Sequence, residues 1–286
     1  MHNRILVTGA NGQLGSELKL ALKQNIFKVF FTDIDDLDIT NIDNIRSFVI
    51  KNNIDTIVNC AAYTAVDKAE DELDKADLIN HLAVKNLAEV AKEVNAFLIH
   101  ISTDYVFSGT NYTPYTENDP TNATGVYGKT KLKGEKAIIE KGINYNIIRT
   151  SWLYSSFGNN FVKTILRLAN ERDSLKVIFD QIGTPTYAAD LANTIVSILN
   201  SNSWKSGIYH YSNEGVASWY DFAQAISELA TAKAKISPCR TEEYPTKAKR
   251  PYYSVLDKSK IKQQYGIEIP HWRNSLAKCI SLIDAK

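Results

Sequence analysis

Gly9, Gly12 and Gly15 stand at three-residue spacing directly after a short apolar run, residues 5–7. The apolar run predicts a strand, and the spacing of apolar residues over 18–22 predicts a helix behind the glycines. Glycine permits a tight turn and lets the backbone approach a pyrophosphate, while a helix N-terminus offers unpaired N–H groups. The stretch therefore predicts a dinucleotide site. Its G-x-x-G-x-x-G spacing departs from G-x-G-x-x-G, so a glycine turn without a ligand is the alternative.

Composition limits the possible partners. The 286 residues carry a net charge of +1, which offers no basic excess for nucleic-acid binding. Cys60, Cys239 and Cys279 lie far apart with no C-x-x-C, a pattern typical of a reducing cytosol rather than of disulfides or zinc. No apolar run approaches the ~20 residues of a membrane span, and the first strand begins too early for a signal peptide. We expect a cytoplasmic protein with no nucleic-acid or membrane partner.

Strands and helices are expected to alternate through the first half of the chain. Such alternation predicts an α/β fold with a doubly wound parallel sheet of Rossmann type. The expected strands are 27–32, 55–62, 97–102 and 143–149, and the expected helices include one capped by Thr40 and another over 77–94. We expect a dinucleotide-binding domain over 1–150 with a later return to the sheet near 180–212. Residues 151–286 are then mainly a smaller, discontinuous α/β substrate-binding region.

Asp33 follows the second expected strand, 18 residues after Gly15. A carboxylate roughly 20 residues past the glycines hydrogen-bonds the adenosine ribose in dinucleotide sites. It would also repel a 2′-phosphate, which favours NADH over NADPH. The alternative is an aspartate that only caps its own loop.

Tyr127 and Lys131 are four residues apart at the start of an expected helix and would share one face. An ammonium near a phenol lowers the pKa of the phenol, which can then pass a proton to a carbonyl oxygen as hydride arrives. Thr103, at the end of the preceding strand, would share this hydrogen bond. A Tyr–Lys pair on a solvated helix face is the alternative, but the position after a dinucleotide half favours catalysis.

Several motifs together resemble the extended short-chain dehydrogenase/reductase superfamily, and within it the dTDP-4-dehydrorhamnose reductase family. They include GANGQLG, AAYTAVDKAE, STDYVF, YGKTKLKGE, RTSWLY and KRPYYSVLDKSKI, and they extend over essentially the whole chain. The resemblance implies an oxidoreductase that uses NADH or NADPH to reduce the 4-keto group of dTDP-4-dehydro-β-L-rhamnose. The product, dTDP-L-rhamnose, is a sugar donor for bacterial polysaccharide biosynthesis.

The resemblance also implies roles for individual residues. Tyr127 would be the proton donor, Lys131 its partner and a ligand of the nicotinamide ribose, and Thr103 the hydroxyl beside the keto oxygen. The implied cofactor contacts are Gly9, Gly12, Gln13, Leu14, Gly15, Asp33, Asp38, Ile39, Ala62, Tyr63 and Thr64. The implied substrate contacts are Thr103, Asp104 and Trp152.

Two departures from the family pattern concern the active-site loop and a metal. The family often has a proline shortly before the catalytic tyrosine, where this chain has residues 122–125, NATG. Some members dimerise around magnesium held by carboxylates; Glu17 matches one of them, but Ala189 stands where another would be. We therefore expect no metal, and a homodimer is left open.

Two residues of the second half have competing interpretations. The Arg250 guanidinium suits a diphosphate, because it pairs with phosphate oxygens in a bidentate fork, but a surface ion pair is an equal alternative. Taken alone, Trp152 would be a core residue; the resemblance instead favours a stacking contact with substrate.

Three functions are compared. The first is the reductase; the second is an epimerase or dehydratase on the same scaffold, and the third is a non-catalytic, sugar-nucleotide-binding regulatory subunit. A dehydratase usually has a glutamate after the aspartate of its active-site strand, whereas Tyr105 follows Asp104 here. A binding subunit would tolerate loss of Thr103, Tyr127 and Lys131, and all three are present.

Overall fold

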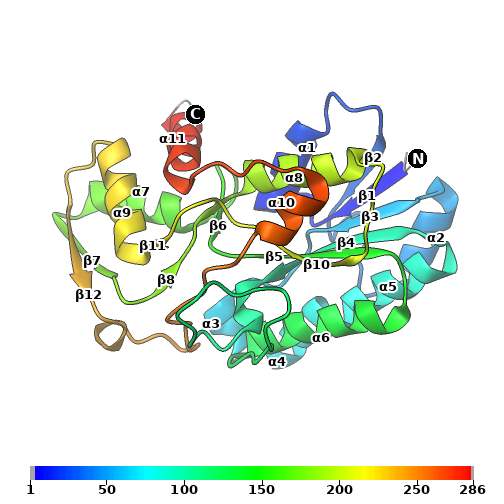
Figure 1. The fold of residues 1–286 in the computed structure, drawn as a ribbon, viewed down its shortest axis with the longest axis horizontal. Helices are drawn as coiled ribbons and strands as arrows, with labels where there is room; N and C mark the ends of the chain where they lie inside the picture. The colour runs from blue at the N-terminus through cyan, green and yellow to red at the C-terminus, as the bar shows by residue number, and fades with distance from the viewer. Residues whose placement is uncertain (1–3, 285–286) are drawn as a thin grey trace.

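Six parallel strands form the central sheet in a computed structural model, which describes residues 4–284 (Figure 1). The strands are β1 (Arg4–Thr8), β2 (Lys28–Thr32), β3 (Thr56–Asn59), β4 (Phe97–Thr103), β5 (Tyr145–Thr150) and β10 (Gly207–His210). Their order is β10-β5-β4-β3-β1-β2, and every neighbouring pair is parallel. The expected doubly wound sheet is confirmed. The strand order reverses beside β1, so the crevice between the carboxyl ends of β1 and β3 is a topological switch point.

Helices cover both faces of this sheet (Figure 1). One apolar cluster joins the sheet to α1 (Gln13–Ala21), α8 (Ala188–Asn200) and α10 (Ser259–Tyr265). A second cluster packs α2 (Ile42–Asn52), α5 (Ala83–Glu93) and α6 (Val126–Lys141) against the opposite face. The strands are apolar on both sides because both sides are covered, as expected of a parallel sheet. No helix in residues 4–284 is long and apolar enough to cross a lipid bilayer.

A smaller lobe has its own apolar core (Figure 1). It contains α7 (Phe161–Glu171), α9 (Trp219–Leu229), α11 (Trp272–Asp284) and the parallel pair β7 (Ser174–Ile178) and β12 (Lys235–Cys239). Two short pairs adjoin it, β6 (Leu153–Tyr154) with β9 (Thr186–Tyr187), and β8 (Ile182–Gly183) with β11 (Ala217–Ser218). Because α8 and β10 leave this lobe and return to the large sheet, the two cores are interleaved along the chain.

One expected helix has a different internal structure. The run over 77–94 belongs to a longer helical segment in which α4 (Leu73–Asp77) continues into a π-helical turn, Leu78–Leu82, and then into α5. The π turn carries Asn80, which is fully buried. Such turns are rare and often occur at functional sites. The remaining short helices are α3 (Val66–Ala69) and the single 3₁₀ turns Asp104–Val106 and Thr241–Glu243.

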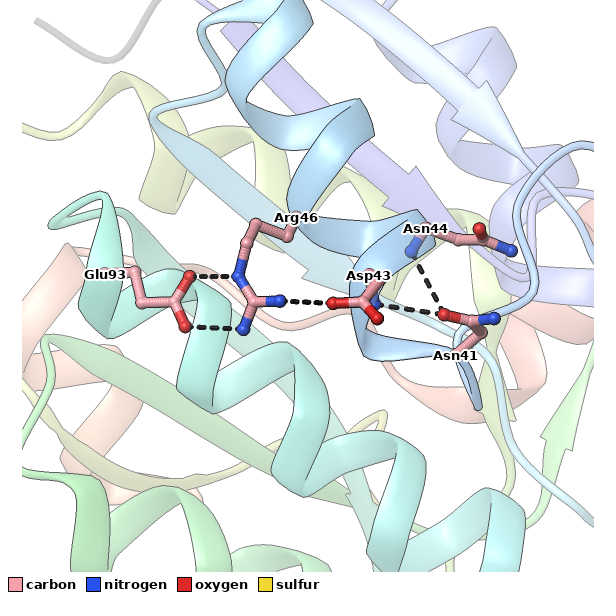
Figure 2. Close-up of polar contacts among 5 residues, drawn as sticks. All are labelled: Asn41, Asp43, Asn44, Arg46 and Glu93. Atoms are coloured by element: carbon pink, nitrogen blue, oxygen red, sulfur yellow. Dashed lines mark hydrogen bonds and ion pairs between the residues drawn. The ribbon is translucent and has the colours of Figure 1, made fainter.

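The expected cap of α2 at Thr40 is wrong by one residue. The Asn41 side chain accepts hydrogen bonds from the backbone N–H groups of Asp43 and Asn44, at 3.0 and 3.2 Å (Figure 2). Thr40 instead donates its hydroxyl to Asp38. In the next turn of α2, Arg46 forms a two-pronged ion pair with Glu93 of α5, at 2.7 and 2.8 Å. The cap and this pair fix the start of α2 against α5.

We expect Asn41→Ala to lower the free energy of unfolding by about 0.5–2 kcal/mol, because two N–H groups at the start of α2 lose their acceptor. Urea denaturation of the wild-type and variant proteins measures this. Asn44→Ala is the matched control, since its exposed side chain contributes no cap. An equal loss of stability in both variants would contradict the assignment of the cap.

Candidate active site

The glycine turn lies at the switch point of the sheet. Gly9 has a φ of +65°, and a Cβ there would lie 2.6 Å from the backbone N of Ala61, which follows β3. A Cβ on Gly15 would lie 2.4 Å from the Gly9 carbonyl oxygen. Gly12 is the N-cap residue of α1; its φ/ψ are extended, and it makes no side-chain cap hydrogen bond. The first-turn N–H groups of α1, from Gln13 and Leu14 onward, thus form a backbone cradle suited to a phosphate.

Asp33 is held beside this cradle. Its Oδ2 accepts a hydrogen bond from the N–H of Asn11, a residue of the glycine turn, at 2.8 Å, and its Oδ1 accepts from the N–H of Ile34 at 2.9 Å. Asp33 therefore caps its own loop, as the alternative interpretation expected. Its hydrogen bond with Asn11 also holds the carboxylate against the glycine turn. Asp38 accepts from the N–H and hydroxyl of Thr40, and the neighbouring Ile39 is buried.

The segment after β3 is fixed by a residue that the sequence reasoning missed. The amide of Asn80 accepts from the N–H of Tyr63 at 2.9 Å and donates to its carbonyl at 3.1 Å, while also donating to Thr130 of α6. Ala62 is half-buried and Thr64 is exposed on either side of Tyr63. Asn80 precedes Val84 and Leu87 by four and seven residues, so a polar residue in line with the apolar face of a helix is the signal that could have marked its position, although not its contacts.

Thr103, Asp104 and Tyr127 are close together at the carboxyl end of β4. The Thr103 hydroxyl donates to the Asp104 carboxylate at 2.9 Å and also hydrogen-bonds the phenol of Tyr127. Asp104 is only 3% exposed, and burial raises its pKa to about 6. Tyr105 packs edge-on against Tyr127, with 5.5 Å between the ring centroids. The expected alcohol–phenol pair is present.

The electrostatic coupling that we expected between Lys131 and Tyr127 is wrong for this state of the protein. Burial raises the pKa of Tyr127, opposed only by the Thr103 hydrogen bond, and Lys131 is not among the groups that shift it. Burial also lowers the pKa of Lys131 to about 8. Lys131 is 1% exposed, and its Nζ donates to the Ile101 carbonyl at 2.6 Å, so the closest polar contacts of the amine are with β4.

Trp152, the first of two candidate substrate contacts in the second half of the chain, packs against the apolar core of the small lobe, as its core interpretation expected. Trp152 has a φ of +48° and stacks on Trp219, with ring centroids 3.6 Å apart. Its indole fits because Gly183 lacks a Cβ, which would lie 2.7 Å from Cε2 of the ring. A left-handed tryptophan is strained, and such strain clusters at functional sites.

Arg250 makes an ion pair, as the second of our two interpretations expected. Its Nη2 donates to Asp67 at 2.5 Å, and its Nη1 donates to the Tyr105 hydroxyl at 3.3 Å. Tyr105 also packs on Tyr127, the candidate general acid, so the Tyr105 side chain lies between the Arg250 guanidinium and Tyr127. The ion pair therefore keeps Arg250 at the edge of the site.

Glu17 and Ala189 do not form a metal site in this structure. The Glu17 carboxylate accepts from the Ser155 hydroxyl at 2.5 Å. Within residues 4–284, no group of three or more His, Cys, Asp or Glu side chains is arranged to hold a metal ion.

A parallel sheet with a glycine turn at its switch point, followed by Thr103, Tyr127 and Lys131, defines an oxidoreductase of the extended short-chain dehydrogenase/reductase superfamily. The family model described as RmlD substrate binding domain matches residues 3–284. The chain belongs to this family, the dTDP-4-dehydrorhamnose reductases.

Individual relatives are similar over nearly the full length. The chain is 43% identical to dTDP-4-dehydrorhamnose reductase of Aggregatibacter actinomycetemcomitans, over 96% of this chain and 97% of the relative. A crystal structure of a dTDP-4-dehydrorhamnose reductase from Clostridium acetobutylicum is 45% identical, with a TM-score of 0.94 and coverage of 98% and 99%. The enzyme from Bacillus anthracis, in complex with NADP, is 40% identical, with the same TM-score and coverage.

We expect Gly15→Ala to lower the free energy of unfolding by about 1–3 kcal/mol, because the added methyl group meets the rigid backbone of Gly9 and Ala10. Chemical denaturation measures the change. Gly12→Ala is the matched control, since its Cβ comes no closer than 3.3 Å to another atom. If Gly12→Ala were the more damaging of the two, the packing of this turn would differ from that described.

Proposed function

We propose that this protein reduces the 4-keto group of dTDP-4-dehydro-β-L-rhamnose with NADH or NADPH, producing dTDP-L-rhamnose. The observation that carries the proposal is the hydroxyl pair of the buried Thr103 and the half-buried Tyr127. This pair and Lys131 lie at the same edge of the sheet as the glycine turn. Membership of the reductase family supplies the substrate class.

A dinucleotide fits the residues at the switch point. Its pyrophosphate suits the backbone cradle, which consists of Gly9, Gly12, Gln13, Leu14 and Gly15. Gly9 and Gly15 lack the Cβ atoms that would collide with neighbouring backbone, so the turn can pack tightly. In our proposal Asp33 binds the adenosine ribose, Asp38 and Ile39 lie along the adenine, and Ala62, Tyr63 and Thr64 flank the nicotinamide half. The bound cofactor supplies the hydride. The relative from Bacillus anthracis binds NADP, which supports this class of cofactor.

Tyr127 is the proposed general acid. Burial raises the pKa of its phenol, so Tyr127 retains its proton at neutral pH and can donate it to the keto oxygen as negative charge develops there. Thr103 orients the phenol and can share a hydrogen bond with the same oxygen. Lys131 lies on the next turn of α6, where its amine can hold the ribose of the cofactor.

Asp104, Trp152 and Arg250 are the proposed substrate contacts. Asp104 is buried next to Thr103, where its carboxyl can hydrogen-bond a sugar hydroxyl. The Trp152 indole offers a flat surface for a ring, and its strained backbone supports a functional role. Arg250 can exchange part of its contact with Asp67 for a contact with a diphosphate oxygen. The planar guanidinium can pair with the oxygens of either a carboxylate or a phosphate.

A direct assay separates the reductase from the other two functions. Purified protein is mixed with dTDP-4-dehydrorhamnose and NADH, and oxidation of the cofactor is followed by absorbance. The reductase oxidises one NADH for each sugar reduced. An epimerase or dehydratase returns its cofactor unchanged, and a binding subunit shows no turnover, so either result would reject the proposal.

We expect Tyr127→Phe to lower kcat by about 10²–10⁴-fold, because the variant keeps the ring but loses the transferable proton. Steady-state kinetics with saturating cofactor measure the loss. Tyr145→Phe is the matched control, since Tyr145 begins β5 at the opposite end of the strand from the site. Full turnover by a Tyr127→Phe enzyme that binds both substrates normally would show that another group is the acid.

We expect Asp33→Ala to increase the ratio of kcat/KM for NADPH to that for NADH, because the carboxylate that would repel a 2′-phosphate is removed. Parallel assays with the two cofactors measure the ratio. Asp35→Ala is the control, since Asp35 is exposed two residues further along the same loop. An unchanged ratio for Asp33→Ala would place Asp33 away from the ribose.

A further inference from the structure

The start of α6 has no side-chain cap of its own. Its N-cap residue is Gly125, which has extended φ/ψ and no side chain with which to accept a hydrogen bond. The first N–H groups of a helix have no partner within the helix, so they need acceptors from elsewhere. Tyr127 is the second residue of α6 and belongs to this first turn. The position of the proposed acid therefore depends on what holds the start of the helix.

Glu70 supplies an acceptor from another segment of the chain. Its Oε1 accepts a hydrogen bond from the backbone N–H of Val126, the first residue of α6, at 2.8 Å. Glu70 directly follows α3 and lies 56 residues before Val126. A carboxylate at a helix N-terminus also interacts favourably with the helix dipole. The cap of α6 is thus supplied by α3.

The fit between Glu70 and Gly125 shows that this cap takes the place of a conventional one. A Cβ on Gly125 would lie 2.9 Å from Oε1 of Glu70. The residues that usually cap helices, Ser, Thr, Asp and Asn, all have a Cβ. Ala69, at the end of α3, is fully buried, and Val126 and Tyr127 pack against its apolar cluster. The end of α3 therefore contacts the first turn of α6 through both polar and apolar atoms.

The side chain and the backbone of Tyr127 are held from different directions. Thr103 hydrogen-bonds its phenol and Tyr105 packs edge-on against its ring, and both residues lie at the carboxyl end of β4. These contacts fix the direction of the side chain, but not the position of the turn from which it starts. In that turn, the Thr130 hydroxyl donates to the Tyr127 carbonyl at 3.0 Å, while Glu70 holds the N–H of the residue before it.

The same short helix also holds the loop that carries Arg250. Asp67, one turn before the end of α3, accepts from the backbone N–H of Ala248 at 3.0 Å and from the Arg250 guanidinium at 2.5 Å. The loop is held through its backbone as well as through its charged side chain. In this arrangement α3 places the proposed acid and the proposed diphosphate contact relative to each other.

We propose that Glu70 is a positioning residue, which caps the first turn of α6 and so holds the Tyr127 phenol where proton transfer takes place. This rests on the proposed function, in which Tyr127 is the general acid. Displacement of a reacting group by about 1 Å can cost roughly 10²-fold in rate, and a frayed first turn allows such a displacement. Glu70 thus acts on the reaction through the backbone of α6.

Hydrogen exchange of the Val126 amide tests the cap without substrate or cofactor. In Glu70→Ala this amide loses its acceptor, so its exchange with solvent is expected to become about tenfold faster, the equivalent of one hydrogen bond. Glu70→Gln keeps an acceptor oxygen on a side chain of the same length and is expected to retain the protection. NMR of the deuterated protein measures the rates. Asp74→Ala, which removes an exposed carboxylate, is the control. Equal rates in the wild type and Glu70→Ala would overturn the proposal.

Kinetics distinguish positioning from a merely structural role. We expect Glu70→Ala to lower kcat by about 10–100-fold with little change in KM for NADH, because the start of α6 moves while the glycine turn does not. Glu70→Gln is expected to retain most of the activity. Full kcat in folded Glu70→Ala, or equal losses in the two variants, would overturn the proposal. Failure of the reductase assay in the wild type would instead reject the proposed function and leave the exchange result standing.

A second cap provides a rescue. Glu70→Ala vacates the space beside Gly125, so Gly125→Ser can be added to it without a collision, and the serine hydroxyl can accept from N–H groups of the first turn. We expect the double variant to recover most of the kcat that Glu70→Ala loses. Gly125→Ser alone is the matched control and should gain nothing, since its Cβ meets Oε1 of Glu70. No recovery in a folded double variant would mean that Glu70 does not act by capping α6.

Discussion

The approach of the Gly9 backbone to that of Ala61 is the contact on which the dinucleotide half of the site depends. It joins the carboxyl ends of β1 and β3, the two strands between which the sheet order reverses. A side chain at Gly9 would push the turn away from the backbone that follows β3, and a side chain at Gly15 would push α1 away from the turn. Because Asp33 is bonded to Asn11 of the same turn, it would move as well. One close packing contact thus positions both ends of the proposed cofactor cradle.

The proposed catalytic half of the site depends on a different interaction, a buried ion pair between α6 and the sheet. Glu135 and Arg149 form two hydrogen bonds at 2.7 and 3.0 Å, and the Ser102 hydroxyl donates to the same carboxylate. Breaking a buried pair on one side is costly because it leaves an uncompensated charge. The pair therefore holds one register of α6 against β4 and β5. That register is what brings Tyr127 to Thr103 and Lys131 to His100.

The sequence was sufficient for the parts of this protein that depend on periodicity. The alternation of expected strands and helices predicted the parallel sheet, and the glycine spacing predicted the position of the turn. The cap of α2 was misplaced because Thr40 and Asn41 are both good caps, and the choice depends on Asp38, which binds the Thr40 hydroxyl. Local sequence alone does not decide between two adjacent candidates.

The pKa of Tyr127 could not be predicted from spacing. Four residues on a helix bring two side chains to one face, but they do not fix where a long lysine side chain ends. The Lys131 amine is drawn toward β4 by the Ile101 carbonyl and by His100, which come from a segment 30 residues away. Asn80 was missed for a related reason: its two bonds to the Tyr63 backbone depend on a π turn, which no apolar pattern indicates.

Burial affects the two members of the Tyr–Lys pair in opposite directions, and both effects favour the neutral form. It raises the pKa of the Tyr127 phenol and lowers that of the Lys131 amine to about 8. At neutral pH the phenol is protonated, whereas an amine with a pKa of about 8 is still mainly an ammonium. In the proposed reaction, a negative charge that develops on the keto oxygen in this low-dielectric region interacts strongly with the few donors present. In our proposal the phenol O–H is the donor that stabilises this charge, and the Thr103 hydroxyl, which donates to Asp104, orients the phenol. A permanently charged lysine would not be required for Tyr127 to donate its proton, because the acid is needed in its protonated form.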